Sequence, residues 1–351
     1  MERYIGIDVH LQSCTLAVLG PTGRKLKSQV VETNGRALIE AIKCVPGRKH
    51  VCLEEGTQSA WLYEILKPHV EEVVVTVPPK RKGNKDDLRD ALERAEELRI
   101  GALKNVVFKA PKMFTGLRDS VRTYGMMTRD VVRVKNRLRA AYRSRGIVTG
   151  ASIYSPGPRE KLEKKLPVSL RCHAAMLGKQ LDALVELQKE AEVWLRKECR
   201  ARKIIKKLST APGMGLIRTA QVVAIVMTPH RFRKVRQFWT YCGFGIVTHS
   251  SADWVKKQDG DWIRSQVIQT RGLNRNRHPQ LKSVFKGAAT TVIMQLAGHP
   301  LHQDYQRMLD SGIKPNLAKL TLSRRIAAAV LSMWKNEEEY DPEKARRKKQ
   351  A

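Results

Sequence analysis

The first part of the chain alternates short apolar runs with polar turns and helix-like segments. The runs YIGIDV and TLAVL come first, and a Gly-Pro-Thr-Gly turn follows them. This pattern predicts three strands in a meander, after which helices and strands alternate, as in an α/β domain with a mixed sheet. The expected elements are strands at 4–9, 15–19 and around Val30, a helix from Asn34, a strand at 50–54, a helix around 61–66, a strand at 73–77 and a helix from Asp87 to about Arg99.

Two long basic helices are expected next, at residues 113–146 and 168–207. In the second, leucines and alanines recur from Leu170 to Leu195 at alternating spacings of three and four, broken once by Gln188, which predicts a coiled-coil-like seam. The Ser-Pro-Gly-Pro segment at 155–158 separates the two helices, because proline cannot continue a helix. We expect an antiparallel helical arm that either spaces two domains or also contributes to dimerisation and nucleic-acid contact.

The last part of the chain has a mostly helical pattern and ends in a highly charged tail. The stretch Pro-Gly-Met-Gly at 212–215 leads into an apolar helix and is similar to a helix-hairpin-helix turn, in which backbone N–H groups meet phosphate. An ordinary turn between two helices explains the same residues. The expected regions are an α/β domain at 1–112, the helical arm at 113–206, a mainly α-helical domain at 207–336 and the basic tail at 337–351.

The charge of the chain points to a polyanionic partner. Lysine and arginine number 66 against 34 aspartates and glutamates, which gives a net charge of +32. Nucleic acid is the expected partner for a chain of such high positive charge, since its binding releases condensed counterions. We expect no membrane role, because no apolar run approaches ~18 residues and the N-terminus leads directly into a strand. The six cysteines show no C-x-x-C spacing, so neither zinc nor disulfides are expected, and a cytoplasmic location fits.

Four acids are placed where they could hold a metal ion. Asp8 and Glu54 each end a predicted strand, and Asp87 and Asp90 share one face of the following helix. In so basic a protein, carboxylates gather where a divalent cation offsets their repulsion, so we expect Mg²⁺, with Mn²⁺ as a substitute. Taken singly, each acid also has an ordinary explanation, as a turn former at a strand end or as an acid in the first turn of a helix.

The segments YIGIDV, CLEEG and NKDDLRDA resemble the three acidic motifs of DEDD-type insertion-sequence transposases, which are bridge-RNA-guided recombinases. The resemblance implies an RNase H-like (RuvC-like) domain whose catalytic, metal-binding quartet is Asp8, Glu54, Asp87 and Asp90. Two departures leave alternatives: Glu55 follows Glu54 where small residues are usual, and Asp86 precedes Asp87.

The same resemblance extends to the C-terminal region. The order PGMG, RQFWTYCGF and VTHSSADW matches the family's transposase domain, and its catalytic serine falls on Ser251. Ser250 is an alternative, since Ala252 stands where the family has glycine, and a turn-forming role explains both serines as well. The resemblance covers residues 3 to about 342.

The resemblance implies an RNA-guided recombinase that exchanges DNA strands through a serine–DNA intermediate. Its implied partners are donor and target DNA, a structured non-coding bridge RNA and further copies of the chain, as a dimer of dimers, at the bacterial nucleoid. The fold expected overall is an α/β RNase H-like domain, a coiled-coil arm and a mainly α-helical transposase domain. Three alternatives remain: a hydrolytic RuvC-like nuclease, a sugar-kinase or actin-type ATPase, which lacks its second phosphate loop here, and a nucleic-acid-binding scaffold without catalysis.

Overall fold

The computed structural model describes residues 1–77, 86–109, 112–249, 254–264 and 269–342. The chain forms two compact units, Met1–Thr115 and Gly116–Ala351. The charged tail predicted at 337–351 lies mostly outside the described residues. Within the described part of the chain, no helix combines the length and apolar character that a membrane span requires.

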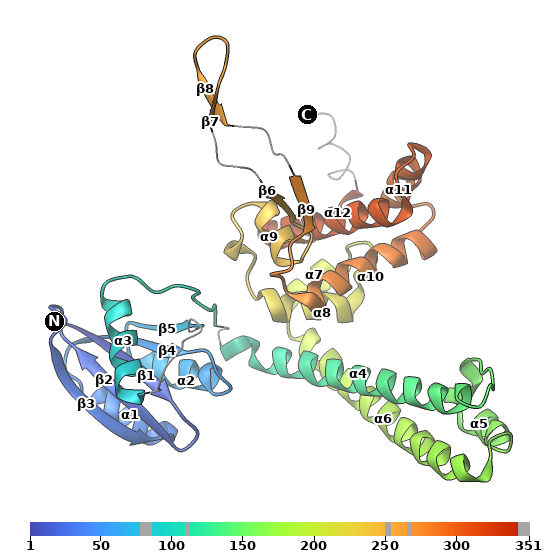
Figure 1. Ribbon diagram of the computed structural model, residues 1–351, viewed down its shortest axis with the longest axis horizontal. Coiled ribbons are helices and arrows are strands. Elements are labelled where there is room, and N and C mark those ends of the chain that lie inside the picture. Colours follow the sequence, from blue (N-terminus) through green and yellow to red (C-terminus); the bar gives the residue numbers. More distant parts are fainter. Residues whose placement is uncertain (78–85, 110–111, 250–253, 265–268, 343–351) are drawn as a thin grey trace. The chain divides into compact units, whose positions relative to one another are not determined.

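A five-stranded mixed sheet forms the centre of the first unit (Figure 1). The first three strands pair antiparallel, and the last two join the first strand in parallel, in the order β3-β2-β1-β4-β5. This arrangement confirms the mixed sheet expected from the apolar runs. The strands are β1 (Glu2–Val9), β2 (Ser13–Leu19), β3 (Lys25–Glu32), β4 (Arg48–Glu54) and β5 (Glu72–Thr76).

Helices cover both faces of this sheet, and the alternation of side chains along β1 decides which helix meets which residue. Ile5 and Ile7 are fully buried in an apolar core with the inner faces of α1 (Gly35–Lys43) and α2 (Ser59–Leu66). Gly6 and Asp8 point to the opposite face, which α3 (Asp87–Arg99) covers. The predicted helix start at Asn34 is confirmed, because the Asn34 side chain accepts a hydrogen bond from the Ala37 amide at 2.8 Å.

An arm of antiparallel helices opens the second unit (Figure 1). Side chains of α4 (Thr115–Arg143) and α6 (Val168–Arg200) share an apolar core, as the seam predicts. Gln188, the polar break in that seam, donates a hydrogen bond to the Thr128 hydroxyl on α4 at 3.0 Å. Two details differ from the prediction. Pro156 starts a short helix, α5 (Pro156–Glu163), because proline fits a first helical turn, and the second long helix ends at Arg200.

The rest of the second unit is mainly helical, as expected, and its helices bury a common apolar core that includes Phe285 and Ile326. Short strands, which the sequence pattern did not indicate, interrupt the helices: β6 (Ile246–His249) pairs with β9 (Gln269–Leu273), and β7 (Trp254–Lys256) with β8 (Trp262–Arg264). The helices are α7 (Lys203–Ser209), α8 (Gly215–Val226), α9 (Val235–Tyr241), α10 (Pro279–Gln295), α11 (Pro300–Asp310) and α12 (Pro315–Asn336).

Candidate functional site

The four predicted acids lie at one edge of the sheet and on the helix beside it. Ile7 of β1 pairs in parallel with Leu53 of β4, so Asp8 and Glu54, the next residues, emerge at the same carboxyl edge. The expectation that these two strands are neighbours is therefore confirmed. Asp87 and Asp90 lie in the first turn of α3, which packs across β1.

A glycine lets α3 approach β1 closely enough to bring its acids to that edge. A Cβ atom at Gly6 would lie 1.9 Å from the Ala91 carbonyl oxygen and 2.7 Å from the Ala95 amide nitrogen, far inside van der Waals contact. Ala91 and Ala95 are completely buried. Asp8 lies two residues along the strand from Gly6 and Asp87 one turn along the helix from Ala91, so the close contact sets both carboxylates side by side.

Asp8, His10 and Asp87 converge at this edge. The His10 Nε2 atom lies 2.9 Å from Asp8 Oδ2 and 3.1 Å from Asp87 Oδ1. One ligand atom from each of the three residues falls within 4.8 Å of the other two, a spacing at which one ion could contact all three. The Asp8 side chain is only 7% exposed, whereas those of His10 and Asp87 are 37% and 45% exposed. Asp8 therefore lies on the buried side of the cluster, and His10 and Asp87 lie on the side that faces solvent.

The remaining acids have other partners in the described residues. Glu54 contacts the guanidinium of Arg94, with Oε1 2.9 Å from one terminal nitrogen, and Arg94 is almost completely buried. Glu55 pairs with Lys109 and accepts a hydrogen bond from the Ser59 hydroxyl at 3.2 Å. Each glutamate thus has its own cation.

Asp86, the neighbour of the predicted ligand Asp87, and Asp90, the other predicted ligand on α3, differ in their placement. The Asp86 side chain accepts hydrogen bonds from the backbone amides of Leu88 and Arg89, at 3.0 and 3.2 Å, and so caps the helix. Asp90 lies about one turn beyond Asp87 and is half-buried, but it is not a member of the three-residue cluster. The structure therefore brings together Asp8 and Asp87 of the predicted quartet.

His10 is the residue of this cluster that the sequence analysis missed. Its signal was present, because His10 follows Asp8 by two positions, directly after β1 ends at Val9, and side chains two positions apart along a strand point the same way. The motif that carries the resemblance directed attention to carboxylates, whereas an imidazole is also a common ligand for transition metals.

Ser250 and Ser251 lie outside the described residues, directly after β6, which ends at His249. The PGMG segment that precedes them in the chain connects α7 to α8 in a helix–turn–helix arrangement. Its contact with phosphate stays a prediction.

Comparisons with known proteins bear on both units. A model of a transposase family matches residues 5–144, which include all four predicted acids. A model described as transposase IS116/IS110/IS902 family matches residues 205–306, which include both candidate serines. A search of curated proteins found no match.

Acids lie at one edge of the sheet, although the chain as a whole is strongly basic. Transposase models match both units. Together these features define the class of protein. It is a transposase, an enzyme that cuts and rejoins the DNA of a mobile element. Within that class, the chain belongs to the IS116/IS110/IS902 family of insertion-sequence transposases, the DEDD-type family whose motifs it resembles.

Proposed function

We propose that this transposase is an RNA-guided DNA recombinase that exchanges strands through a serine–DNA intermediate. The main support for the proposal is that Asp8 and Asp87, which are distant in sequence, come together with His10. One ligand atom from each of the three residues lies within 4.8 Å of the others. The RNase H-like fold belongs to the same proposal. It is supported by the mixed sheet order β3-β2-β1-β4-β5, with acids at the carboxyl ends of two neighbouring parallel strands.

The residues at this edge fit a divalent cation. Carboxylates from Asp8 and Asp87 are the oxygen ligands that Mg²⁺ prefers, and the His10 imidazole would favour Mn²⁺ as the substitute. Asp90 and Glu54 complete the proposed quartet, and Glu54 would join it by exchanging its contact with Arg94. A cation held here would stabilise the charge that develops on a scissile phosphate and on the departing oxygen.

The proposed nucleophile is Ser251. Its hydroxyl oxygen bonds to the scissile phosphorus as the bond from that phosphorus to one deoxyribose oxygen breaks, and the departing oxygen takes up the serine proton. Reversal of this step, with the oxygen of a different DNA end attacking the phosphoserine, rejoins the strands. The energy of each broken bond is kept in the covalent intermediate, so no external energy source is needed.

The quartet and Ser251 belong to different units of the chain, so we propose that the complete site is assembled between protomers of a homo-oligomer. The net charge of +32 supports extensive contact with nucleic-acid backbones. In the proposed arrangement a structured RNA pairs with donor and target DNA and supplies the sequence specificity, while basic side chains hold the backbones.

Trapping of the intermediate tests the proposal. The full-length protein is incubated with Mg²⁺, a nicked suicide DNA substrate and either the transcript of the element's own non-coding flank or an unrelated RNA of equal length. We expect a covalent adduct only with the element's transcript, located on Ser251 by mass spectrometry after digestion. Ser251→Ala should bind RNA and DNA yet form no adduct, whereas the matched variant Ser250→Ala should keep a substantial fraction of activity.

Each other outcome changes the assignment in a defined way. An adduct on Ser250 moves the nucleophile by one residue. Equal adduct yield with both RNAs removes RNA guidance and leaves a DNA transposase. Free 3′-hydroxyl ends with no adduct on any serine indicate a hydrolytic nuclease instead.

A further inference from the structure

The hairpin of β7 and β8 in the second unit carries large apolar side chains at its surface (Figure 1). Every residue from Trp254 to Ile263 is exposed. The exposed fractions of its four large apolar residues are 56% for Trp254, 51% for Val255, 61% for Trp262 and 41% for Ile263. A two-stranded hairpin is only marginally stable by itself in water, and a group of exposed apolar side chains marks a site where another molecule binds.

The pairing of the two strands divides these residues between two faces. Lys256 lies directly across from Trp262, and Trp254 lies two residues before Lys256 on the same strand, so these three residues share one face. Val255 and Ile263 pair with each other on the opposite face. The two tryptophans occupy diagonal positions about 7–8 Å apart, within reach of one bound strand. We call the face with Trp254, Lys256 and Trp262 the tryptophan face.

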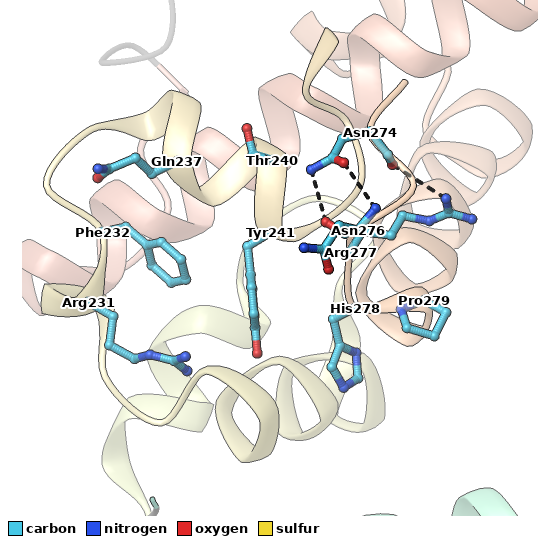
Figure 2. Close-up of a pocket in the computed structure, with 10 residues that line it drawn as sticks. All are labelled: Arg231, Phe232, Gln237, Thr240, Tyr241, Asn274, Asn276, Arg277, His278 and Pro279. Atoms are coloured by element: carbon cyan, nitrogen blue, oxygen red, sulfur yellow. Dashed lines mark hydrogen bonds between the residues drawn. The ribbon is translucent and has the colours of Figure 1, made fainter. Parts of the chain in front are cut away.

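The aromatic rings beside α9 are arranged differently, because neighbouring side chains cover them (Figure 2). They line a pocket formed by the segment before α9, by α9 itself and by the chain between β9 and α10. The Arg231 guanidinium lies 5.2 Å from the Tyr241 ring centroid, and the His278 ring centroid lies 6.1 Å from it. Tyr241 therefore leaves little ring surface for a further planar group, whereas both tryptophans of the hairpin are more than half exposed.

Cations accompany the tryptophans. Lys256 lies on the tryptophan face and Lys257 follows it, and both are exposed. The acids Asp259 and Asp261 lie in the turn between the strands, where the Asp261 amide donates to Asp259 Oδ1 at 3.1 Å. The tryptophan face thus combines rings of the kind on which bases stack with a cation that suits a phosphate.

The position of the hairpin in the chain indicates which molecule it meets. Trp254 follows Ser251, the proposed nucleophile, by three residues. Three residues of fully extended chain span at most about 11 Å between Cα atoms. When Ser251 attacks a phosphate, the start of β7 must therefore lie beside the DNA that contains this phosphate.

We propose that the tryptophan face binds the DNA strand next to the cleavage position, with unpaired bases stacked on Trp254 and Trp262 and a phosphate near Lys256. Strand exchange requires that bases beside the cut leave their old partners, and such bases expose ring surfaces that an indole can cover. The inference deepens the proposed function and rests on it, because Ser251 gives the location. It adds a DNA-contacting element that holds separated bases beside the reacting phosphate.

Site-specific crosslinking tests the contact in a protein whose hairpin is unchanged. The cleavage position is first mapped from the DNA ends that wild type produces. Ser251→Ala is then incubated with Mg²⁺, the element's transcript and DNA that carries one 5-iododeoxyuridine. Irradiation should crosslink this base to peptides from residues 254–264 when it lies within about three nucleotides of the cut, since about 11 Å of chain matches about three base steps. Crosslinks confined to other peptides refute the inference.

Variants of the two faces provide a second test, in the Ser251→Ala background where no strand is cut. Two DNA substrates of equal length differ only in whether about three base pairs at the cleavage position are mismatched. The protein should bind the mismatched DNA about tenfold more tightly, and Trp262→Leu should reduce this preference to about threefold or less, as the loss of base stacking implies. Lys256→Gln should weaken binding of both substrates alike.

Two matched controls accompany these variants. Ile263→Thr alters the opposite face of the same hairpin, and Trp194→Leu removes an exposed tryptophan of α6. Both should keep the preference for mismatched DNA. A loss in either control as large as that in Trp262→Leu would overturn the inference.

Further measurements identify other occupants. Crosslinks to the hairpin from 5-iodouridine in the transcript, with none from DNA, would assign the tryptophan face to RNA and overturn the inference. A lower molar mass of Trp262→Leu than of wild type without nucleic acid would identify an interface between copies of the chain, with the same consequence. A Ser251 adduct without hairpin crosslinks refutes this inference alone. Hairpin crosslinks with cleavage but no serine adduct refute the serine mechanism and leave the DNA contact standing.

Discussion

Arg94 of the first unit and the half-buried Arg218 and Arg324 of the second unit are held in opposite ways, whereas the buried Arg159 of the arm pairs with Asp182 and so resembles Arg94. In the first unit, Arg94 is enclosed by the carboxylates of Glu54 and Glu97, which outweigh the effect of burial and raise its pKa. In the second unit, Arg218 donates to the Gly213 carbonyl and the Thr291 hydroxyl, and burial lowers its pKa. Arg324 likewise donates to the Phe244 carbonyl oxygen and has its pKa lowered by burial.

This difference shows how one basic chain can serve two kinds of ligand. Where acids outnumber the cations around them, as at the sheet edge of the first unit, other acids such as Asp8 and Asp87 can gather at a site for a metal ion. Where cations are held by neutral carbonyl oxygens, their charge is not cancelled within the protein and remains available to an anion. The predictions below test this contrast.

The largest effect is expected from loss of an acid at the sheet edge. Asp8→Asn removes the buried carboxylate of the cluster, and we expect strand cleavage to fall on the order of a hundred- to a thousandfold. Mn²⁺ binding, followed by electron paramagnetic resonance, should weaken in parallel, with folding retained. The matched variant Asp310→Asn, on the exposed end of α11, should change neither quantity. Undiminished cleavage by Asp8→Asn in EDTA would contradict the assignment.

An intermediate effect is expected from replacing Arg94 and Arg218 themselves. Arg94→Met leaves Glu54 and Glu97 without their shared cation, and we expect it to destabilise the first unit by about 3 kcal/mol. Arg218→Met leaves only a carbonyl and a hydroxyl without a donor and should cost the second unit about 1–2 kcal/mol. Hydrogen exchange of the β4 and α8 amides measures the two units separately. A larger loss of unfolding free energy in Arg218→Met than in Arg94→Met would contradict the proposed difference between the two units.

The smallest effect is an opposite pH dependence of the two units. Burial opposes charging of His50, but hydrogen bonds to Glu2 and Glu72, at 2.6 and 2.8 Å, prevail and raise its pKa above the ordinary value of 6.5. The stabilisation that charged His50 gives the first unit is therefore complete below about pH 6.5. It is lost as the pH rises through the folded-state pKa of His50. Burial lowers the pKa of His278, so its contribution is complete above about pH 6.5 and declines as the pH falls.

Hydrogen exchange at pH 8 and pH 5.5 checks this prediction. Toward the lower pH, the free energy of unfolding should rise in the first unit and fall in the second. The variant His50→Gln, which keeps hydrogen-bonding capacity without the charge, should abolish the gain. Parallel changes in both units would show that other groups dominate.

The sequence predicted best those features that depend on residues close together in the chain. Short apolar runs between polar turns predicted the strands, and the position of Asp8 and Glu54 at strand ends predicted their common edge. The polar helix predicted from Asp87 to about Arg99 is confirmed as α3. These features depend on neighbours in the chain, so a single sequence contains them.

Contacts between distant segments could not be predicted in the same way. The pairing of Glu54 with Arg94 depends on how α3 lies on the sheet, and that position depends on Gly6. The pocket around Tyr241 joins two segments that short strands bring together, and those strands have no clear apolar alternation. Both arrangements depend on tertiary packing, which no local sequence pattern indicates.

The contact between Gln188 and Thr128 limits how the arm can change during evolution. In an otherwise apolar seam, this polar contact forms in a single alignment of the two helices. Any slide breaks it and removes the Gln188 amide from its acceptor, while the Thr128 hydroxyl still donates to the Tyr124 carbonyl of its own helix. A deletion in α4 alone would shift every residue beyond it out of step with α6. Viable changes in arm length must therefore add or remove matching turns in both helices, on the side of the pair that faces α5.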